Sequence, residues 1–200
     1  MANSTSRFDA ATTALVLIDL QNGILGRPLE PHSAADVLEA GKALAAKFRE
    51  AGAPVVLVNV GWSVDLKDLP PGTVEQPISL PEGGLPPGWA DLVDGLAQPG
   101  DLRIAKRQWG AFYGTDLDLQ LRRRGIKTIV LGGVATNFGV ESTARSAHEH
   151  GYSVVFAEDA MTSMSAVLHA TAVEHILPRI GIIAQSAEIS LTAGLASRDE

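Results

Sequence analysis

Strand-like apolar runs alternate with amphipathic helical stretches along most of this 200-residue chain. This alternation predicts a parallel sheet with helices on both faces, because each crossover between parallel strands packs a helix against the sheet. We therefore expect an α/β fold, a three-layer α/β/α sandwich around a Rossmann-like six-stranded parallel sheet. With the strands numbered along the chain, the expected order is 3-2-1-4-5-6. The six strands are expected at Thr13–Asp19, Pro54–Val58, Leu102–Ala105, Lys127–Leu131, Ser153–Ala157 and Ile180–Ile183.

The helices are indicated by capping residues and by apolar spacing. Ser33 and Asp36 form a capping-box pattern, apolar residues recur at helical spacing as far as Phe48, and Gly52 ends that helix. Further helices are expected at Asp116–Arg124, Thr136–His150 and Ala166–Leu177. A chain of this length fits one domain with a sizeable core, so we expect a single domain over residues 1–200 with its core between about 13 and 183.

Composition argues against several classes of partner. The net charge of −7 disfavours nucleic acid, and the one dense basic run, residues 122–124, is typical of a solvated helix end. The absence of cysteine excludes disulfides and thiolate chemistry. No apolar run is long enough to cross a bilayer, and the polar segment Met1–Ala11 lacks the apolar centre of a signal peptide. We expect a soluble, cytoplasmic protein with no nucleic-acid or membrane partner.

A long stretch from Val60 to Gly100 holds most of the prolines. A loop of this length inside a compact domain is usually functional or part of an interface, although a variable surface excursion is an equal alternative. We expect a homo-oligomer, a dimer or a tetramer, with this region as a candidate contact surface.

Three features converge on the carboxyl edge of the predicted sheet, where α/β proteins bind ligands. Asp19 ends the first strand and Lys106 follows the third. Residues 132–140 (GGVATNFGV) lead from the fourth strand into a helix, whose free N–H groups favour an anion or oxyanion. Each feature also has a structural interpretation: a turn cap, a solvated charge and a glycine-rich packing turn, respectively. Their conjunction favours an active site.

The same three segments resemble the signature blocks of isochorismatase-like hydrolases, in the cysteine hydrolase superfamily. The blocks are residues 14–22 (ALVLIDLQN), Lys106 with residues 111–115 (AFYGT), and residues 133–145 (GVATNFGVESTAR). The resemblance extends from about Thr13 to about Ile183 and implies the Rossmann-like sandwich. Most members use an Asp–Lys–Cys triad. By position, Asp19 matches the acid/base, Lys106 the lysine and Gly139 the cysteine. The family also has a cis peptide bond, which here would join Val134 to Ala135.

Gly139 has no side chain, so covalent catalysis at this position is excluded. The resemblance then points to the members that lack the cysteine and cleave a vinyl ether with water. Asp19 would be the general acid, Lys106 an electrostatic partner, and the backbone amides of Ala135 and Gly139 would line an anion site. We expect a hydrolase acting on a small anionic metabolite. The alternatives are an inert ligand-binding member and an amide hydrolase that uses water activated by Asp19.

The remaining expectations concern binding residues and metals. The aromatic residues near the carboxyl edge of the predicted sheet are by default core residues. Alternatively, they line a small apolar pocket. No cofactor is expected. No metal site is expected: residues 59–65 contain none of the histidines that bind zinc in nicotinamidases of this family. The other histidines, including His32 and His169, show no ligand spacing. The candidate substrate-binding residues are Gln21, Trp62, Arg107, Trp109, Tyr113, Ala135 and Thr136.

Overall fold

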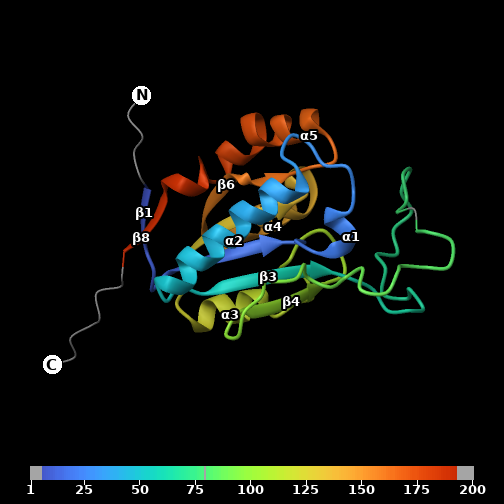
Figure 1. Ribbon diagram of the computed structural model, residues 1–200, viewed down its shortest axis with the longest axis horizontal. Helices are drawn as coiled ribbons and strands as arrows, with labels where there is room; N and C mark the ends of the chain where they lie inside the picture. Colours follow the sequence, from blue (N-terminus) through green and yellow to red (C-terminus); the bar gives the residue numbers. More distant parts are fainter. Residues whose placement is uncertain (1–5, 79, 193–200) are drawn as a thin grey trace.

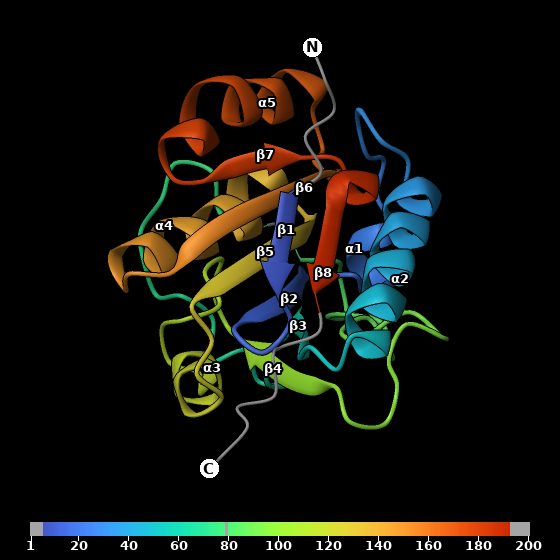
Figure 2. The ribbon, with the colours of Figure 1, turned by 90° about the vertical axis from the view of Figure 1, so that its left-hand side faces the viewer.

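Six parallel strands form the main sheet (Figure 1), and Figure 2 labels them in their order along the sheet, β4-β3-β2-β5-β6-β7. The computed structural model describes residues 6–78 and 80–192. Numbered along the chain, the strands follow 3-2-1-4-5-6, so the predicted fold class and strand order are confirmed. The strands are β2 (Thr13–Ile18), β3 (Val55–Val60), β4 (Leu102–Lys106), β5 (Thr128–Val134), β6 (Ser153–Thr162) and β7 (Ile182–Ala184).

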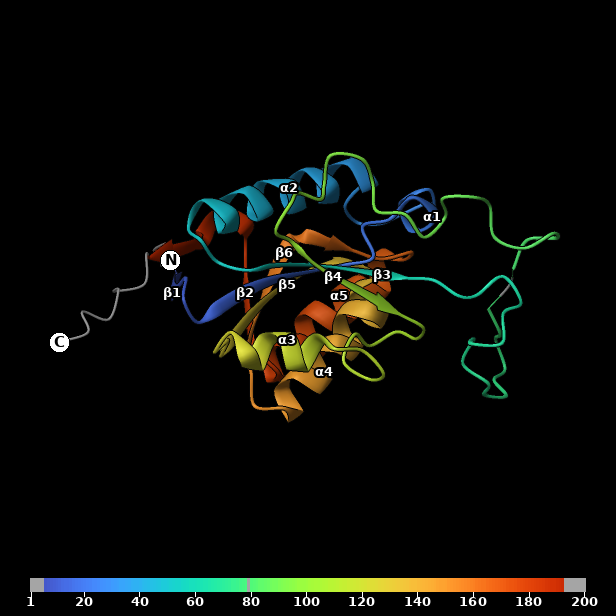
Figure 3. The same ribbon diagram turned by 90° about the horizontal axis from the view of Figure 1, so that it is seen from below.

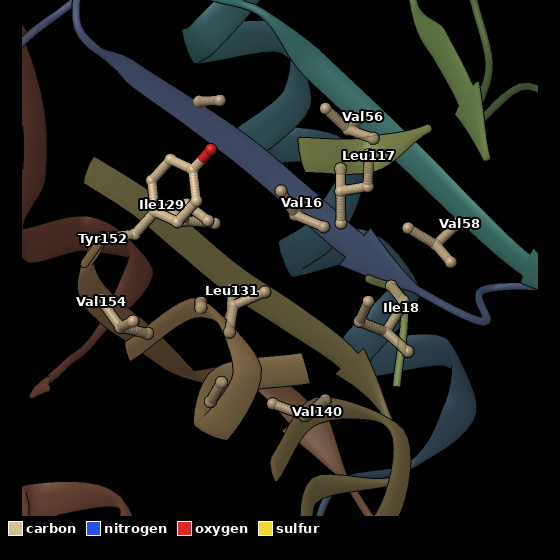
Figure 4. Packing of buried hydrophobic residues seen from close by; sticks show 14 of the residues in the cluster. Val16, Ile18, Val56, Val58, Leu117, Ile129, Leu131, Val140, Tyr152 and Val154 are labelled. Atoms are coloured by element: carbon tan, nitrogen blue, oxygen red, sulfur yellow. The ribbon is translucent and has the colours of Figure 1, made fainter. Parts of the chain in front are cut away.

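Helices cover both faces of this sheet, as Figure 3 shows edge-on. Helix α2 (Ala34–Glu50) lies on one face and buries residues such as Phe48 against alternate side chains of β2 and β3. Helices α3 (Leu117–Arg123) and α4 (Glu141–Glu149) lie on the other face. Figure 4 shows that second core, in which Val16 and Ile18 of β2 pack with Val140 and their neighbours. Because strand residues alternate between the faces, each buried strand contributes to both cores.

Several predicted boundaries differ at the carboxyl edge. The expected helix Thr136–His150 begins as a π-helical turn, η1 (Thr136–Val140), before α4. β6 runs five residues beyond its predicted end at Ala157, because a register shift against β5 absorbs extra residues and lets pairing resume at Met161. The expected helix Ala166–Leu177 consists of α5 (Ala166–Thr171) followed by the turns η2 (Ala172–Ile176) and η3 (Leu177–Arg179).

Four short elements were not predicted. β1 (Ser6–Asp9) pairs in parallel with β8 (Ile189–Thr192), which follows the turn η4 (Ser186–Glu188). Figure 2 shows this pair side by side at the amino-terminal end of the main sheet. α1 (Asn22–Leu25) is a single turn beyond β2. Elements of three or four residues carry too little periodicity to be recognised from sequence.

The long segment between β3 and β4 divides into two parts. Most of residues 63–78 and 80–86 extends away from the sheet beyond its carboxyl edge (Figures 1 and 3). Residues 89–93 return to the sheet, where the carbonyls of Trp89 and Asp91 accept hydrogen bonds from Gly23 and Asn22, and the amide of Val93 donates to Leu20. Within the described ranges, no helix has the length and apolar character that a membrane crossing requires.

Candidate active site

The carboxyl ends of β2, β4 and β5 bring together the residues that the sequence predicted to be catalytic. Asp19 follows β2 directly, in a left-handed backbone conformation with φ of 53° that Asp tolerates better than most residues. Lys106 is the last residue of β4 and reaches past β3 to Asp19. Gly139 lies in η1, directly after β5. Three segments far apart in sequence therefore meet at one point of the sheet edge.

Asp19 and Lys106 form a buried ion pair. Lys106 Nζ lies 2.7 Å from Asp19 Oδ2 and also donates to the carbonyl of Gln108 at 3.2 Å. The two residues are only 5% and 2% exposed. Burial raises the pKa of Asp19 from 3.8 to about 6, because desolvation of the carboxylate outweighs the charge and hydrogen bond of Lys106, which lower it. Asp19 therefore titrates near the pH at which a catalytic acid or base is most effective.

The second carboxyl oxygen of Asp19 has no partner. Asp19 Oδ1 is the one buried side-chain nitrogen or oxygen without a hydrogen bond in the described part of the chain. Buried polar atoms are nearly always paired, since an unpaired one costs about 1–3 kcal/mol. The exception at this position leaves one oxygen of a titrating carboxyl group without a protein partner.

The turn between β5 and η1 brings backbone close to Asp19. The Val134–Ala135 peptide bond is cis, as the resemblance implied. Gly133 has a φ of 111°, and a β-carbon there would lie 2.0 Å from the carbonyl oxygen of Ile18, so only glycine allows β5 to pass β2 at this point. The Val140 amide donates to the Ala135 carbonyl at 3.1 Å, the wide hydrogen bond of a π-helical turn.

Gly139 faces the ion pair at close range. A β-carbon on Gly139 would lie 3.4 Å from Asp19 Oδ2 and 2.9 Å from Ile18 Cγ2. The position assigned to the family's nucleophile is thus beside the carboxyl group of Asp19. The volume that a side chain would occupy there is partly taken by a methyl group of Ile18.

Three of the predicted binding residues differ widely in exposure. Trp109 is 59% exposed, and its ring centroid lies 4.8 Å from that of Phe138 in η1. Tyr113 is 84% exposed and leaves its ring free in solvent. Ala135, at the amino end of η1, is 6% exposed. Trp109 and Phe138 form the aromatic pair nearest in sequence to Lys106 and Gly139. Phe138 was not predicted as a binding residue, because one aromatic residue in a turn carries no periodicity.

The polar groups of the other four predicted binding residues already have protein partners. The side-chain amide of Gln21 forms two hydrogen bonds with the backbone of Val60, at 2.8 and 2.9 Å, and joins β2 to β3. The Trp62 indole donates to the carbonyl of Arg107, and the Arg107 guanidinium lies 2.7 Å from Asp68. The Thr136 hydroxyl donates to the carbonyl of Thr162 and contacts His169. Trp89, stacked on Trp62 at 5.8 Å, was missed because it lies in the long loop.

A second polar cluster lies on the other side of Thr136. Nε2 of His32 and Nε2 of His169 lie 2.9 and 3.0 Å from the same oxygen of Glu158, Oε1. Hydrogen bonds, with that from His169 contributing most, lower the pKa of Glu158 to about 2 despite its partial burial. Among residues 6–78 and 80–192, this is the group of His, Asp and Glu side chains whose atoms, within 4.8 Å of one another, could share a metal ion.

Comparisons with known proteins agree with this fold. The Isochorismatase domain family matches residues 13–188. The chain is 52% identical over 184 residues to the isochorismatase family protein YecD of Escherichia coli O157:H7, covering 90% of this chain and 96% of that protein. It is 33% identical over 175 residues to a ureidoacrylate amidohydrolase, RutB, of Methylorubrum extorquens, covering 76% of this chain and 71% of that protein.

A solved structure supports the same assignment. An isochorismatase family protein from Burkholderia thailandensis superposes with a TM-score of 0.86 at 44% identity, covering 90% of this chain and 94% of that one. The family model, the first relative and this solved structure each match most of the chain. The chain belongs to the isochorismatase family of hydrolases.

Proposed function

We propose that the protein hydrolyses a small anionic metabolite without a covalent intermediate, using Asp19 as a general acid in vinyl-ether cleavage of the isochorismatase type. The observation that carries this proposal is the unpaired, buried Oδ1 of Asp19, whose other oxygen is held by Lys106. A carboxyl with a pKa of about 6 keeps a protonated fraction near neutral pH, which an acid catalyst requires.

In the proposed reaction, Oδ1–H of Asp19 donates its proton to the enol-ether carbon. The resulting oxocarbenium ion adds water, and Asp19, now a carboxylate, takes a proton from that water. The hemiketal then separates into a carbonyl compound and an alcohol. Lys106 holds the carboxylate in place and stabilises its charge in the second half of the cycle. No step needs a side chain at Gly139, where a nucleophilic residue would stand in a cysteine hydrolase.

Binding is proposed to use the turn and the aromatic pair. The backbone amides of Ala135 and Gly139 would face an anionic oxygen of the substrate, and Trp109 with Phe138 would cover an apolar part of it. We also propose that the exposed side chain of Tyr113 contacts the substrate from the solvent side. For Gln21, Trp62, Arg107 and Thr136, whose polar groups have protein partners, we propose a positioning role in place of the direct substrate contact expected from sequence.

Amide hydrolysis is the second candidate, and the 33% identity to an amidohydrolase favours it. Here the Asp19 carboxylate, held as an anion by Lys106, would take a proton from water that attacks the amide carbon. The same carboxyl would serve as a base, and Gly139 would leave room for the water molecule.

The pH dependence of turnover separates the two candidates. A screen by thermal shift against isochorismate, nicotinamide and carbamoyl compounds identifies the ligand class, and turnover is then measured from about pH 4.5 to 8.5, a range that spans the pKa of Asp19. If Asp19 is the acid, kcat falls about tenfold per pH unit above a pKa of about 6. If Asp19 is the base, kcat falls below that pKa and is constant above it. Ligand binding without turnover at any pH would contradict both mechanisms and identify an inert binding protein.

A further inference from the structure

The contacts of Thr136 are compatible with the tautomer of His169 that a metal ion requires. A threonine hydroxyl has one proton, and Thr136 Oγ1 lies 3.1 Å from the carbonyl of Thr162 and 2.8 Å from His169 Nδ1. When the hydroxyl proton points to the Thr162 carbonyl, Nδ1–H of His169 donates to Thr136 Oγ1. In that tautomer, Nε2 of the neutral ring carries the lone pair that a metal ion binds.

Nε2 of His169 faces a carboxylate oxygen. It lies 3.0 Å from Glu158 Oε1, and His32 Nε2 approaches the same oxygen at 2.9 Å. Without a metal, a proton on each Nε2 makes these contacts hydrogen bonds, and a divalent cation can replace those protons. Glu158 Oε2 is occupied separately by Gln185 Nε2 at 3.0 Å, so Oε1 is the oxygen that the two imidazoles share.

From these contacts we propose that His32, Glu158 and His169 bind a divalent transition-metal ion of the Zn²⁺ class, through the two Nε2 atoms and Oε1. Two imidazoles and one carboxylate form a recognised Zn²⁺ ligand set, which leaves a fourth position for water. Ligands at about 2.1 Å from a metal lie about 3.0–3.4 Å from one another at angles of about 90–110°. The two observed N–O distances of 2.9 and 3.0 Å need only a small outward shift.

The surroundings are those of a built metal site. His169 is 4% exposed, and its Nδ1–H is held by Thr136, the kind of outer partner that orients a metal-binding imidazole. The His32 side chain is 31% exposed and lines an open hollow of about 370 Å³, which gives an ion a route in. Three carboxylates from Asp36, Glu39 and Asp159 also line that hollow and favour cations over anions.

The proposed ion would join three segments that are distant in sequence. His32 precedes α2, Glu158 lies in β6 and His169 lies in α5. Through His169 the ion would also fix Thr136, the first residue of the η1 turn that carries Gly139. We therefore assign the metal a structural role that supports the turn. This proposal does not depend on the reaction proposed for Asp19.

Metal binding is tested on the full chain after chelator treatment and dialysis. Equilibrium dialysis with Zn²⁺, read by elemental analysis, should give one ion per chain. Co²⁺ should give the visible absorption of a tetrahedral nitrogen–oxygen site. A Zn²⁺ concentration of about 100 times Kd should raise the melting temperature by about 5–10 °C for a chain of this size.

Variants then locate the site. Glu158→Gln and His32→Ala should each lower Zn²⁺ affinity at least about tenfold, because each removes a proposed ligand. The control is His175→Ala, which changes an exposed histidine outside the cluster and should keep wild-type affinity. Because His32 is partly exposed, its variant remains informative if Glu158→Gln does not fold. Less than about 0.2 Zn²⁺ per wild-type chain would overturn the proposal, as would unchanged affinity in the His32 variant. Loss of binding in His175→Ala would place the ion elsewhere and overturn it too.

Discussion

Two carboxyl groups beside the same turn have opposite properties. Asp19 is almost fully buried, has one unpaired oxygen, and has a pKa raised to about 6 by desolvation. Glu158 is partly exposed, has partners on both oxygens, and has a pKa lowered to about 2, chiefly by His169. Each lies near one side of η1, the first near Gly139 and the second beyond Thr136.

The difference shows that the balance between burial and hydrogen bonding sets the pKa of a carboxyl group. Asp19 has a lysine in contact and still titrates near 6, because burial removes more stabilisation from the anion than one lysine restores. Glu158 keeps its charge at every physiological pH because several donors face it. The first is suited to proton transfer, and the second to holding a cation.

The largest expected effect comes from Asp19→Asn, which removes the proton without changing the shape of the side chain. We expect turnover to fall by about 10²-fold or more, the scale of general acid–base catalysis. Glu158→Gln, measured in parallel with chelator present, should cost less than about tenfold, since that carboxyl is not proposed to transfer a proton. Equal losses in the two variants would remove the distinction between the carboxyls, and near-normal turnover of Asp19→Asn would remove Asp19 from both mechanisms.

A smaller effect is expected for Lys106→Met, which keeps the length of the side chain but removes its charge. Loss of Lys106 removes the influence that lowers the pKa of Asp19, so that pKa should rise above about 6. We expect turnover to fall by about tenfold or more, and the pH range over which turnover changes with the titration of Asp19 to move to higher pH. An unchanged rate and pH range would show that Lys106 has no part in the reaction.

The stability of the same variant should depend on pH. A carboxyl whose pKa is higher in the folded state than in the unfolded state stabilises the fold below its unfolded pKa of 3.8. That contribution is lost as pH rises through the folded pKa. The melting temperature of Lys106→Met should therefore lie within a few degrees of wild type at about pH 5 and fall further behind it at about pH 8. Thermal melts across this range, with the exposed-lysine variant Lys67→Met as control, measure the difference.

The smallest effect is expected for a thiol placed beside the ion pair, in Gly139→Cys. The backbone of Gly139 has no positive φ, so the obstacle is steric, with Ile18 Cγ2 2.9 Å from the new β-carbon. Overpacking of this kind costs about 1–3 kcal/mol, or roughly 3–10 °C in melting temperature. Gly139→Ala, which adds the same β-carbon without sulfur, should show the same loss.

The thiol itself reports on the charge at the site. Because the native chain has no cysteine, alkylation rate against pH measures this one thiol without background. Lys106 and the amino end of the helix lower the pKa of the thiol, and the ionised carboxyl group of Asp19, close to the new β-carbon, raises it. We expect a net lowering of up to about one unit from the ordinary value of about 8.5. A folded variant with an inaccessible thiol, or with a pKa at or above that value, would show that this turn is a packing element and not an active site.

Much of the fold could be predicted from the local pattern of the sequence. Apolar runs and helical spacing specified the six strands of the main sheet and the capped start of α2, and the resemblance of three blocks pointed to Asp19, Lys106 and Gly139. These predictions succeed because binary patterning and capping are encoded in neighbouring residues. The strand order was predicted from the Rossmann-like order that is common in doubly wound α/β sheets.

Other features depended on contacts between distant residues. Sequence spacing gave no reason to join His32 to His169, because most of the chain separates them, and the extension of β6 brings Glu158 between them. Nor could it tell that the polar groups of Gln21 and Arg107 are already bonded to Val60 and Asp68.

The sequence by itself determined the fold class, the absence of a cysteine nucleophile and the identity of the three residues at the carboxyl edge. Only the tertiary structure decided which oxygen of Asp19 lacks a partner and that two histidines share one oxygen of Glu158. The physical reason is that secondary structure follows from short-range periodicity, whereas burial and hydrogen-bond pairing exist only after the chain has closed on itself. The chemistry of a carboxyl group depends on that second kind of information.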